Sequence, residues 1–302
     1  MNDVGALIRF RRRQDQLFNA VGMLATAVGV LALTALLVKL AIDGVPYLTP
    51  RFFTSGESVI TPARAGIFPA IMGTLAVVMV TFLSAVPLGV ASAVYLEEYA
   101  RKNWLTDVIE INISNLAGVP SITFGLLGYW FFCYLLDFRP VVFVGGLTLA
   151  ILVLPIIIVT TREALRSIPG TIREAAYAAG ATKWQVIRFH LIPYSMGGIL
   201  TGTIIALSRA IGETAPLIAL GGGGFSEVPA APFLSRPPFI SFAWLNSSFS
   251  VLPMQMYLWT DAPQHILQQK AAATGLVLIV LTLSLNAVAI VVRYRIRKRI
   301  KW

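Results

Sequence analysis

Six apolar stretches leave this chain few folds to adopt. They lie at residues 17–42, 68–96, 111–136, 140–160, 195–220 and 273–292, and each is close to the ~20 residues that an α-helix needs to cross a bilayer. Hydrophobic residues make up 57% of the 302 residues and charged residues 13%, against about 45–50% and about 25% in a soluble domain. A helix satisfies its own backbone hydrogen bonds in hydrocarbon. The sequence therefore predicts an all-α polytopic membrane protein with six transmembrane helices.

Basic residues are distributed unequally around these stretches. The segments on one side, which include both termini, contain 17 of the 24 Lys and Arg residues, and the segments on the other side contain five. Because cytoplasmic loops carry the excess of basic residues, both termini are predicted to be cytoplasmic. Orientation in the membrane also explains the net charge of +10, and no basic stretch interleaved with exposed aromatics indicates nucleic-acid binding.

Several kinds of chemistry lack support in the sequence. Cys133 is the single cysteine, so neither an internal disulfide nor a cysteine metal cluster is expected. His190 and His265 lie on opposite predicted sides of the membrane, too far apart for a metal site. No G-x-x-x-x-G-K-[ST] sequence occurs, so we do not expect this chain to hydrolyse ATP. No catalytic residue and no bound metal are predicted.

The charge pattern and the apolar stretches divide the chain into four parts. These are a basic N-terminal segment at 1–16, a first transmembrane helix with its outer loop at 17–66, a core at 67–293 and a basic tail at 294–302. The first stretch is too long for the apolar part of a signal peptide, and we expect it to be retained. Within the core, a cytoplasmic loop occupies 161–194 and an apolar, proline-rich outer loop occupies 221–272. The outer loop either packs on the bundle as short helices or forms a docking face for an extracytoplasmic partner.

The second and third stretches contain polar and small residues that a lipid-facing helix would not need. Pro87 and Gly89 can bend the second stretch, and Glu97 and Glu98 at its end are predicted to meet water. The first half of the third stretch either packs closely against other helices or lines a polar path. Its small and polar residues are Asn112, Ser114, Asn115, Gly118, Pro120, Ser121 and Gly125.

Arg209 and Glu213 are charged residues inside the fifth stretch. A spacing of three or four residues places them on one helical face with smaller residues; the series is Gly198, Gly202, Ala206, Arg209, Glu213 and Pro216. A charge inside hydrocarbon costs at least about 2.5–3.5 kcal/mol and faces a partner or an aqueous cavity. Two interpretations remain open: a structural ion pair that locks two helices, and a pathway for an ion or substrate. A forked guanidinium suits an oxyanion.

The pathway interpretation selects five residues. Arg209, Glu213 and Ser208 would line the pathway from the fifth stretch, and Asn115 and Ser121 from the third. Phosphate at neutral pH retains a proton and can donate a hydrogen bond to Glu213, whereas sulfate cannot. Glu213 is therefore expected either to help reject sulfate or only to balance the charge of Arg209.

The cytoplasmic loop has clear helix signals. Residues 173–179 are predicted to form one short helix, Gly180 its left-handed stop, and Thr182 the cap of a second helix that ends before Pro193. The loop contains Glu174-Ala175-Ala176, a glycine six residues after the glutamate and a proline thirteen residues after the glycine, and in this it resembles the EAA loop of ABC-importer permeases. It differs in that His190 and Ile192 replace the usual isoleucine and leucine. The resemblance implies that the first helix docks into an ATPase subunit, with Glu174, Ala175, Ala176 and Gly180 as the coupling element.

Four further segments narrow the resemblance. PLGVASAVYLEEYA, NLAGVPSITFGLLG, SRAIGETAPL and PMQMYLW are similar to the A-type permease subunit of bacterial phosphate importers, from the second stretch to the end of the chain. The resemblance implies a type I ABC importer permease fold in a prokaryotic cytoplasmic membrane. It also implies a heterodimer with a C-type permease, an ATPase dimer that holds ATP-Mg, and an extracytoplasmic phosphate-binding protein, with no cofactor in this chain.

The resulting hypothesis is a transporter subunit rather than an enzyme. It would pass inorganic phosphate inward by alternating access, with Arg209 and a matching arginine of the partner subunit offsetting the desolvation of a dianion. Three alternatives remain: a permease for another oxyanion such as molybdate or sulfate, a signalling scaffold that does not transport, and a passive channel. The resemblance to the EAA loop argues against the channel.

Overall fold

The computed structural model describes residues 2–58, 61–221 and 242–299. These residues form helices and contain no β-strand. Five helical segments are long and apolar enough to cross a membrane, and one bent pair makes a sixth candidate span. The prediction of an all-α protein with six membrane spans is confirmed. The α-helices in chain order are α1 (Asn2–Gly44), α2 (Pro50–Thr54), α3 (Phe68–Val94), α4 (Trp104–Leu116), α5 (Ser121–Gly128), α6 (Val142–Arg166), α7 (Gly170–Ala178), α8 (Lys183–Val186), α9 (Ile192–Gly212), α10 (Ala215–Ala219), α11 (Leu252–Thr260) and α12 (His265–Arg299).

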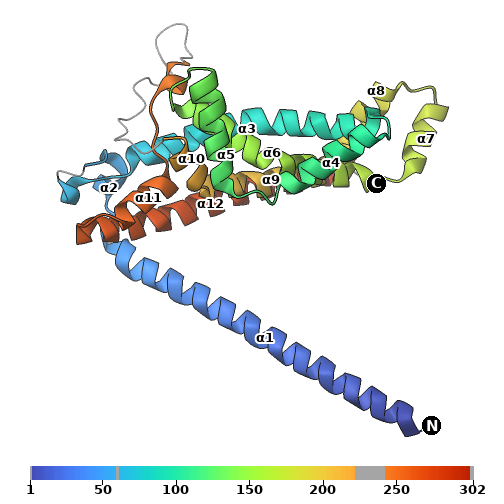
Figure 1. The fold of residues 1–302 in the computed structure, drawn as a ribbon, viewed down its shortest axis with the longest axis horizontal. Coiled ribbons are helices and arrows are strands. Elements are labelled where there is room, and N and C mark those ends of the chain that lie inside the picture. The colour runs from blue at the N-terminus through green and yellow to red at the C-terminus, as the bar shows by residue number, and fades with distance from the viewer. Residues whose placement is uncertain (1, 59–60, 222–241, 300–302) are drawn as a thin grey trace.

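Helix α1 stands away from the other helices along most of its length (Figure 1). It is continuous through the predicted boundary at residue 16, and its apolar side chains, such as Leu24 and Leu31, are exposed. Only its C-terminal end meets the bundle, where a Cβ atom on Gly44 would lie 2.7 Å from the Ala273 backbone nitrogen. An exposed apolar helix of this length needs lipid or another protein around it.

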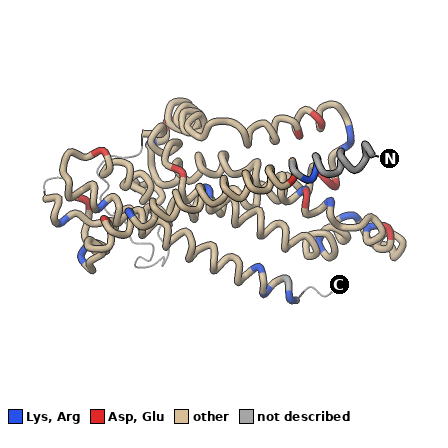
Figure 2. Tube along the Cα trace, turned by 90° about the horizontal axis from the view of Figure 1, so that it is seen from below, with Lys and Arg blue, Asp and Glu red and all other residues tan. Residues whose placement is uncertain are grey.

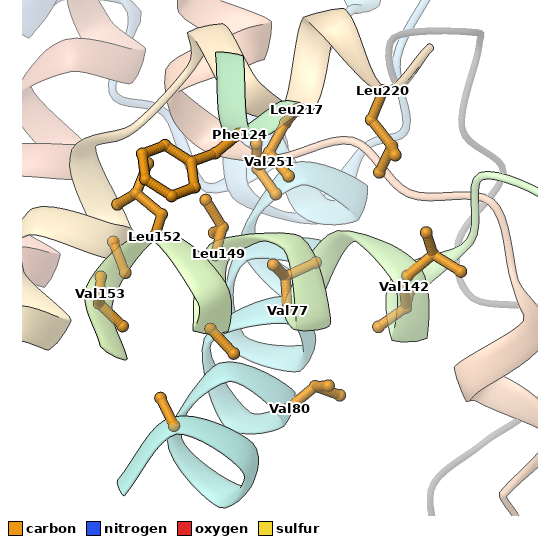
Figure 3. Packing of buried hydrophobic residues seen from close by; sticks show 14 of the residues in the cluster. Val77, Val80, Phe124, Val142, Leu149, Leu152, Val153, Leu217, Leu220 and Val251 are labelled. Carbon is orange, nitrogen blue, oxygen red and sulfur yellow. The ribbon is translucent and has the colours of Figure 1, made fainter. Parts of the chain in front are cut away.

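The core is built around α6, which packs between α3 and α9. Figure 3 shows Val77 and Val80 of α3 against Leu149 and Val153 of α6, part of one cluster of buried apolar side chains. The Thr81 hydroxyl donates a hydrogen bond to the Gly146 carbonyl oxygen at 3.1 Å. A helix that is apolar on all sides belongs in the middle of a bundle. The helix begins at Val142, two residues after the Pro140 start that the sequence predicted.

The third apolar stretch is broken, so the prediction of one continuous helix at 111–136 is wrong. Helices α4 and α5 meet at an angle of 109°, and α5 continues into a wider π-helical turn, Tyr129–Leu135. Pro120 lies directly before α5; it has no N–H group and disfavours a helical conformation of the preceding residue. Gly125 packs closely on Pro216 of α10, as expected of a small residue, whereas Gly118 meets only the carbonyl of Asn115.

The fifth stretch also differs from its prediction at both ends. Helix α8 does not end before Pro193 but passes through a π-helical turn, Ile187–Leu191, into α9. Pro193 has no N–H group to donate, and in a regular α-helix its ring would clash with the carbonyl of the residue four positions earlier; the wider turn directly before it relieves this conflict. At the other end α9 stops at Gly212, Glu213 has an extended backbone with φ −79° and ψ 124°, and α10 follows.

The described part of the outer loop is ordered against the bundle. Helix α11 buries Leu252, Met254 and Trp259, and Gln255 donates a hydrogen bond to Glu57 at 2.9 Å. This confirms that the loop packs on the bundle here. The predicted docking face falls mostly on residues 222–241, outside the described residues.

Both termini and the α7–α8 segment lie at one end of the molecule, and α2 and α11 lie at the other (Figure 1). Figure 2 shows basic residues at both ends. The termini therefore share one side with the segment predicted to be the cytoplasmic loop. That this side faces the cytoplasm stays a prediction.

The contact between α6 and α9 generates a test of the packing. A Cβ atom on Gly202 would overlap the Thr160 side chain, whereas one on Gly197 would meet nothing within 4 Å. We expect Gly202→Ala to lower the free energy of unfolding by about 1–3 kcal/mol, as overpacking does. Unfolding in mixed micelles with increasing denaturing detergent would measure it.

Gly197→Ala is the matched control on the same helix. It should be neutral or stabilise by up to about 1 kcal/mol, because alanine favours the helix. Equal effects of the two substitutions would contradict the close contact between α6 and α9.

Candidate functional site

The charged residues of the fifth stretch form an ion pair. Arg209 Nε donates to Glu213 Oε1 at 3.1 Å, and the side chains are 39% and 17% exposed. Arg209 lies in the last turn of α9, where the helix dipole favours a cation, and Glu213 follows the helix end. The two residues are thus brought together as predicted, although Glu213 lies beyond the helix rather than on its face.

The space beside this pair is too small to hold a phosphate ion. Glu213 lines a cavity of about 10 Å³ with Thr74 and Pro253, and about 10–15 Å³ is the least that one water molecule needs. Arg209 is exposed on the surface of the chain. A pathway that includes Arg209 therefore runs along the surface of this chain, where a second chain would complete it.

The other predicted pathway residues are placed differently. Ser208 Oγ lies 2.6 Å from Asn286 Oδ1 of α12, so this hydroxyl joins α9 to α12. Asn115 is exposed near the end of α4, and Ser121 is half-buried at the start of α5. They flank the break between the two helices, and none of the hydrogen bonds found among the described residues joins them to Arg209.

The small residues of the α9 series serve packing. Gly198 and Gly202 lie against Ala164 and Thr160 of α6, and Ala206 is fully buried. The residues predicted to share one helical face therefore have two different environments. The small residues contact α6, and Arg209 lies at the surface.

The α7–α8 segment has the predicted turn and cap, although α7 begins at Gly170 rather than at residue 173. Gly180 has φ +82°, a left-handed conformation that glycine adopts at the end of a helix. Thr182 caps α8, and its side chain and that of Gln185 form a capping box. Glu174 and Ala175 are exposed on α7, whereas Ala176 is buried against a cluster that includes Val94, Leu165 and Val186. Three of the four predicted coupling residues, Glu174, Ala175 and Gly180, are therefore exposed, and Ala176 packs inside the chain.

Glu97 and Glu98 are only partly exposed and pair with arginines, whereas the sequence predicted that they meet water. Their side chains are 17% and 9% exposed, and both form ion pairs. Arg166 Nε lies 2.9 Å from Glu97. Arg162, which is 8% exposed, binds both Glu97 and Glu110. Glu97 and Glu98 belong to the π-helical turn Tyr95–Tyr99 that follows α3, and Glu110 lies in the middle of α4, so this network joins these two segments to the end of α6.

A second ion pair extends the network to α7. Arg173 lies beside the exposed Glu174, and its Nη2 donates to Glu98 Oε1 at 3.0 Å. The same guanidinium donates to the carbonyl oxygens of Ile168 and Leu165 at 3.1 Å each. Arg173 therefore connects α7 to the turn after α3 and to the C-terminal end of α6.

Sequence reasoning missed these arginines and glutamates as a network. The available signal was charge complementarity: acidic residues end the second stretch and begin the third, and arginines begin the loop at 161–194. Which acid meets which arginine depends on how the helices pack, and the sequence contains no local signal for that.

A known family matches most of the chain. Residues 85–302 match the family model described as the binding-protein-dependent transport system inner membrane component. The matched region includes α4 to α12, and hence both the Arg209–Glu213 pair and the α7–α8 segment.

Individual relatives agree with this match. The "Probable ABC transporter permease protein YqgI" of Bacillus subtilis is 30% identical, over 92% of this chain and 95% of the relative. The "Phosphate transport system permease protein PstA 1" of Mycobacterium tuberculosis is 32% identical, over 78% of this chain and 72% of the relative. The "Phosphate transport system permease protein PstA" of Haemophilus influenzae is 30% identical, over 84% of each.

Solved structures share the fold at low sequence identity. A chain of a bacterial alginate ABC transporter, in complex with an alginate-bound periplasmic protein, matches with a TM-score of 0.65 at 15% identity over 92% of this chain and 93% of that chain. A chain of the inward-facing methionine transporter MetNI matches with a TM-score of 0.57 at 16% identity over 76% of this chain and 95% of that chain. The architecture is that of ABC importer permeases.

The buried arginine of the network predicts a stability effect. Arg162→Gln would leave Glu97 and Glu110 with weaker partners, and we expect it to lower the free energy of unfolding by about 1–3 kcal/mol. The same detergent unfolding experiment would measure the change.

Arg188→Gln provides the control, because Arg188 is exposed and forms none of the ion pairs found in the described chain. It should change stability by less than about 0.5 kcal/mol. An Arg162 variant as stable as this control would show that the network does not support the fold.

Proposed function

Because this chain belongs to the family of binding-protein-dependent transport system inner membrane components, we propose that it is a permease subunit of an ATP-driven phosphate importer. As a multi-pass permease of this bacterial family, it is a component of the inner membrane. Relatives named as phosphate transport permeases support phosphate as the substrate. The observation that carries the proposal is Arg209, a partly exposed guanidinium inside an apolar span.

Arg209 is the proposed anion ligand. A guanidinium remains charged at any physiological pH and presents a planar fork of donors that matches the oxygens of phosphate. Its Nε is engaged with Glu213, which leaves the terminal nitrogens for the anion. A second arginine from the partner permease would supply the other positive charge, and two cations together offset part of the desolvation of a dianion.

A second permease is required to complete the pathway. Arg209 lies at the surface, and its neighbouring cavity is too small for the ion. Helix α1 stands exposed beside the bundle (Figure 1), and an apolar groove of about 620 Å³ lies between α3 and α9. These apolar surfaces fit a heterodimer with a C-type permease, and an extracytoplasmic phosphate-binding protein would deliver the ion to the outer end.

Coupling to ATP hydrolysis is assigned to α7. Glu174 and Ala175 are exposed on this helix and would contact the ATPase dimer, which binds ATP-Mg, while Gly180 allows the sharp turn after the helix. Arg173 connects α7 to Glu98 and to the end of α6. Closure of the ATPase dimer would thus move α3 and α6 together and switch the pathway between outward and inward access.

The breaks in the membrane helices support alternating access. Helices α5 and α10 each follow a break, and Gly125 of α5 packs on Pro216 of α10. Non-helical backbone at membrane depth is tolerated where it is buried in protein or lines a cavity, and transporters commonly place substrate sites at such discontinuous helices. Asn115 and Ser121 flank one break and Glu213 follows α9 at the other, so we retain these three as pathway residues. Ser208 of α9 would support the pathway through its hydrogen bond to Asn286 of α12.

Removing the charge of Arg209 is the direct test. The complete transporter, with its partner permease, ATPase and binding protein, would be reconstituted in vesicles, and ATP-driven uptake of phosphate measured. We expect Arg209→Gln to reduce uptake at least about a hundredfold, because the anion would lose one of its two cations in the pathway, and leaving a desolvated charge without its partner costs about 3–5 kcal/mol. Arg209→Lys should retain part of the activity.

Co-purification of all subunits must be unchanged for this result to count. Arg139→Gln is the control, since Arg139 is exposed in the segment before α6 and should leave uptake unaltered. Normal uptake by the Arg209→Gln transporter would make Arg209 a structural charge. If the vesicles take up molybdate or sulfate instead of phosphate, the chain is still a permease subunit but its substrate is a different oxyanion.

Glu213 predicts an effect on selectivity. Protonated phosphate can donate a hydrogen bond to this carboxylate, and sulfate cannot. We expect Glu213→Gln to raise sulfate uptake relative to phosphate uptake by roughly tenfold, because a hydrogen bond to a charged group contributes about 1.5–3 kcal/mol.

Competition between the two anions in the same vesicles would measure this ratio. Glu163→Gln, at an exposed acidic residue near the end of α6, is the control. An unchanged ratio in the Glu213 variant would leave charge balance for Arg209 as the role of this carboxylate.

A further inference from the structure

A second group of cations lies at the end of the molecule opposite to α7 and α8. Arg51 of α2, Arg64 and Lys270 of α12 line one cavity of about 120 Å³. Arg64 belongs to the short 3₁₀ turn Pro62–Arg64. No carboxylate lines the cavity. Figure 1 shows α2 at this end, far along the bundle from α7, so the cavity is separate from the network at the ends of α3 and α6.

Lys270 forms one wall of the cavity and binds the turn that carries Arg64. Its side chain is buried, and Nζ donates to the carbonyl oxygens of Pro62, Ala63 and Ala65 at 2.8, 3.0 and 2.6 Å. These bonds use all three ammonium hydrogens and fix the turn that carries Arg64. Lys270 therefore contributes its positive charge to the cavity, and the hydrogen bonds to a ligand must come from other groups.

The positive charges lack a counter-charge within the described chain. None of the ion pairs found among the described residues includes Arg51, Arg64 or Lys270. Glu57 is the first acidic residue after Arg51 in the sequence, and it accepts a hydrogen bond from Gln255 rather than pairing with Arg51. Like charges around one cavity repel each other. An anion in the cavity would offset this repulsion.

The donors that remain free suit a phosphate group. Arg51 and Arg64 are exposed, and their guanidinium groups can each bind two phosphate oxygens. Thr49, which also lines the cavity, accepts a hydrogen bond from the Phe52 N–H group at 3.3 Å and keeps its hydroxyl hydrogen for a ligand. The cavity volume of about 120 Å³ is many times the about 10–15 Å³ that one water molecule needs, so the cavity has room for a group larger than water.

We propose that this cavity binds a phosphate group at the outer membrane surface of the protein. The candidate span Gln14–Tyr47 ends beside the cavity, and the candidate span His265–Ile296 begins beside it. The cavity therefore lies where these helices leave the bilayer. Inorganic phosphate and the headgroup of an anionic phospholipid both reach that level. The site is independent of Arg209; only its position on the outer side depends on the proposed function.

The experiment measures binding rather than transport, so its result does not depend on whether phosphate is transported. The permease pair with its ATPase, without the binding protein, would carry Arg209→Gln to silence the proposed pathway site. Binding of radiolabelled inorganic phosphate would be measured in nanodiscs of phosphatidylcholine alone. Retention of phosphatidylglycerol would be measured by native mass spectrometry after extraction from discs that contain it.

Arg51→Gln and Arg64→Gln are the test variants, and Arg139→Gln, an exposed arginine outside the cavity, is the matched control. We expect each test variant to bind the phosphate group about tenfold more weakly than the control, because each loses one charge-assisted contact. Lys270 is left intact, because its substitution would release the turn at Pro62–Arg64.

The two arms identify the source of the phosphate group. Loss of inorganic phosphate binding in the test variants would assign a free ion, and loss of phosphatidylglycerol retention would assign a lipid headgroup. If both test variants match the Arg139→Gln control in both arms, the cavity does not bind phosphate groups and the proposal is overturned.

Discussion

Close contact between α6 and its two neighbours, α3 and α9, is the interaction on which the other features depend. Lipid tails are as apolar as the helices themselves, so membrane helices associate through tight packing and interhelical hydrogen bonds. Gly202 allows α9 to approach Thr160, and the bond from Thr81 to the Gly146 carbonyl joins α3 to α6. This contact brings Arg162, near the end of α6, to Glu97 in the turn after α3 and to Glu110 within α4.

The charged residues show how the protein reduces the cost of placing charge near hydrocarbon. Arg162 is nearly buried and has two carboxylates, whereas Arg209 is partly exposed and has one. The first arrangement is suited to holding helix ends together. The second leaves donors at a surface, as an anion pathway between two subunits would require. The same fold thus places a paired, nearly buried arginine at the α7–α8 end and a partly exposed arginine within a span.

The breaks between α4 and α5 and between α9 and α10 distinguish these helices, which are proposed to change conformation during transport, from the continuous helices of the bundle. Helices α3 and α6 span the bundle without interruption of their helical course, and the network at their ends connects them to α7 through Arg173. Helices α4 and α5 meet at 109°, and α9 gives way to α10 at Glu213. The proposed coupling to the ATPase at α7 and the proposed pathway along the broken helices are compatible, because the continuous helices α3 and α6 connect the two regions.

The six spans, the left-handed turn at Gly180 and the Thr182 cap were predictable from the sequence, because backbone hydrogen bonding in lipid and helix termination depend on local residues. The pair Arg209–Glu213 was predictable from its spacing. The break before Pro120, the passage of α8 into α9 and the pairing of Glu97 and Glu98 with arginines some 65 to 75 positions away were decided by tertiary structure. Whether a proline ends a helix or only widens its turn, and which charges meet, depends on neighbours that packing brings from distant parts of the chain.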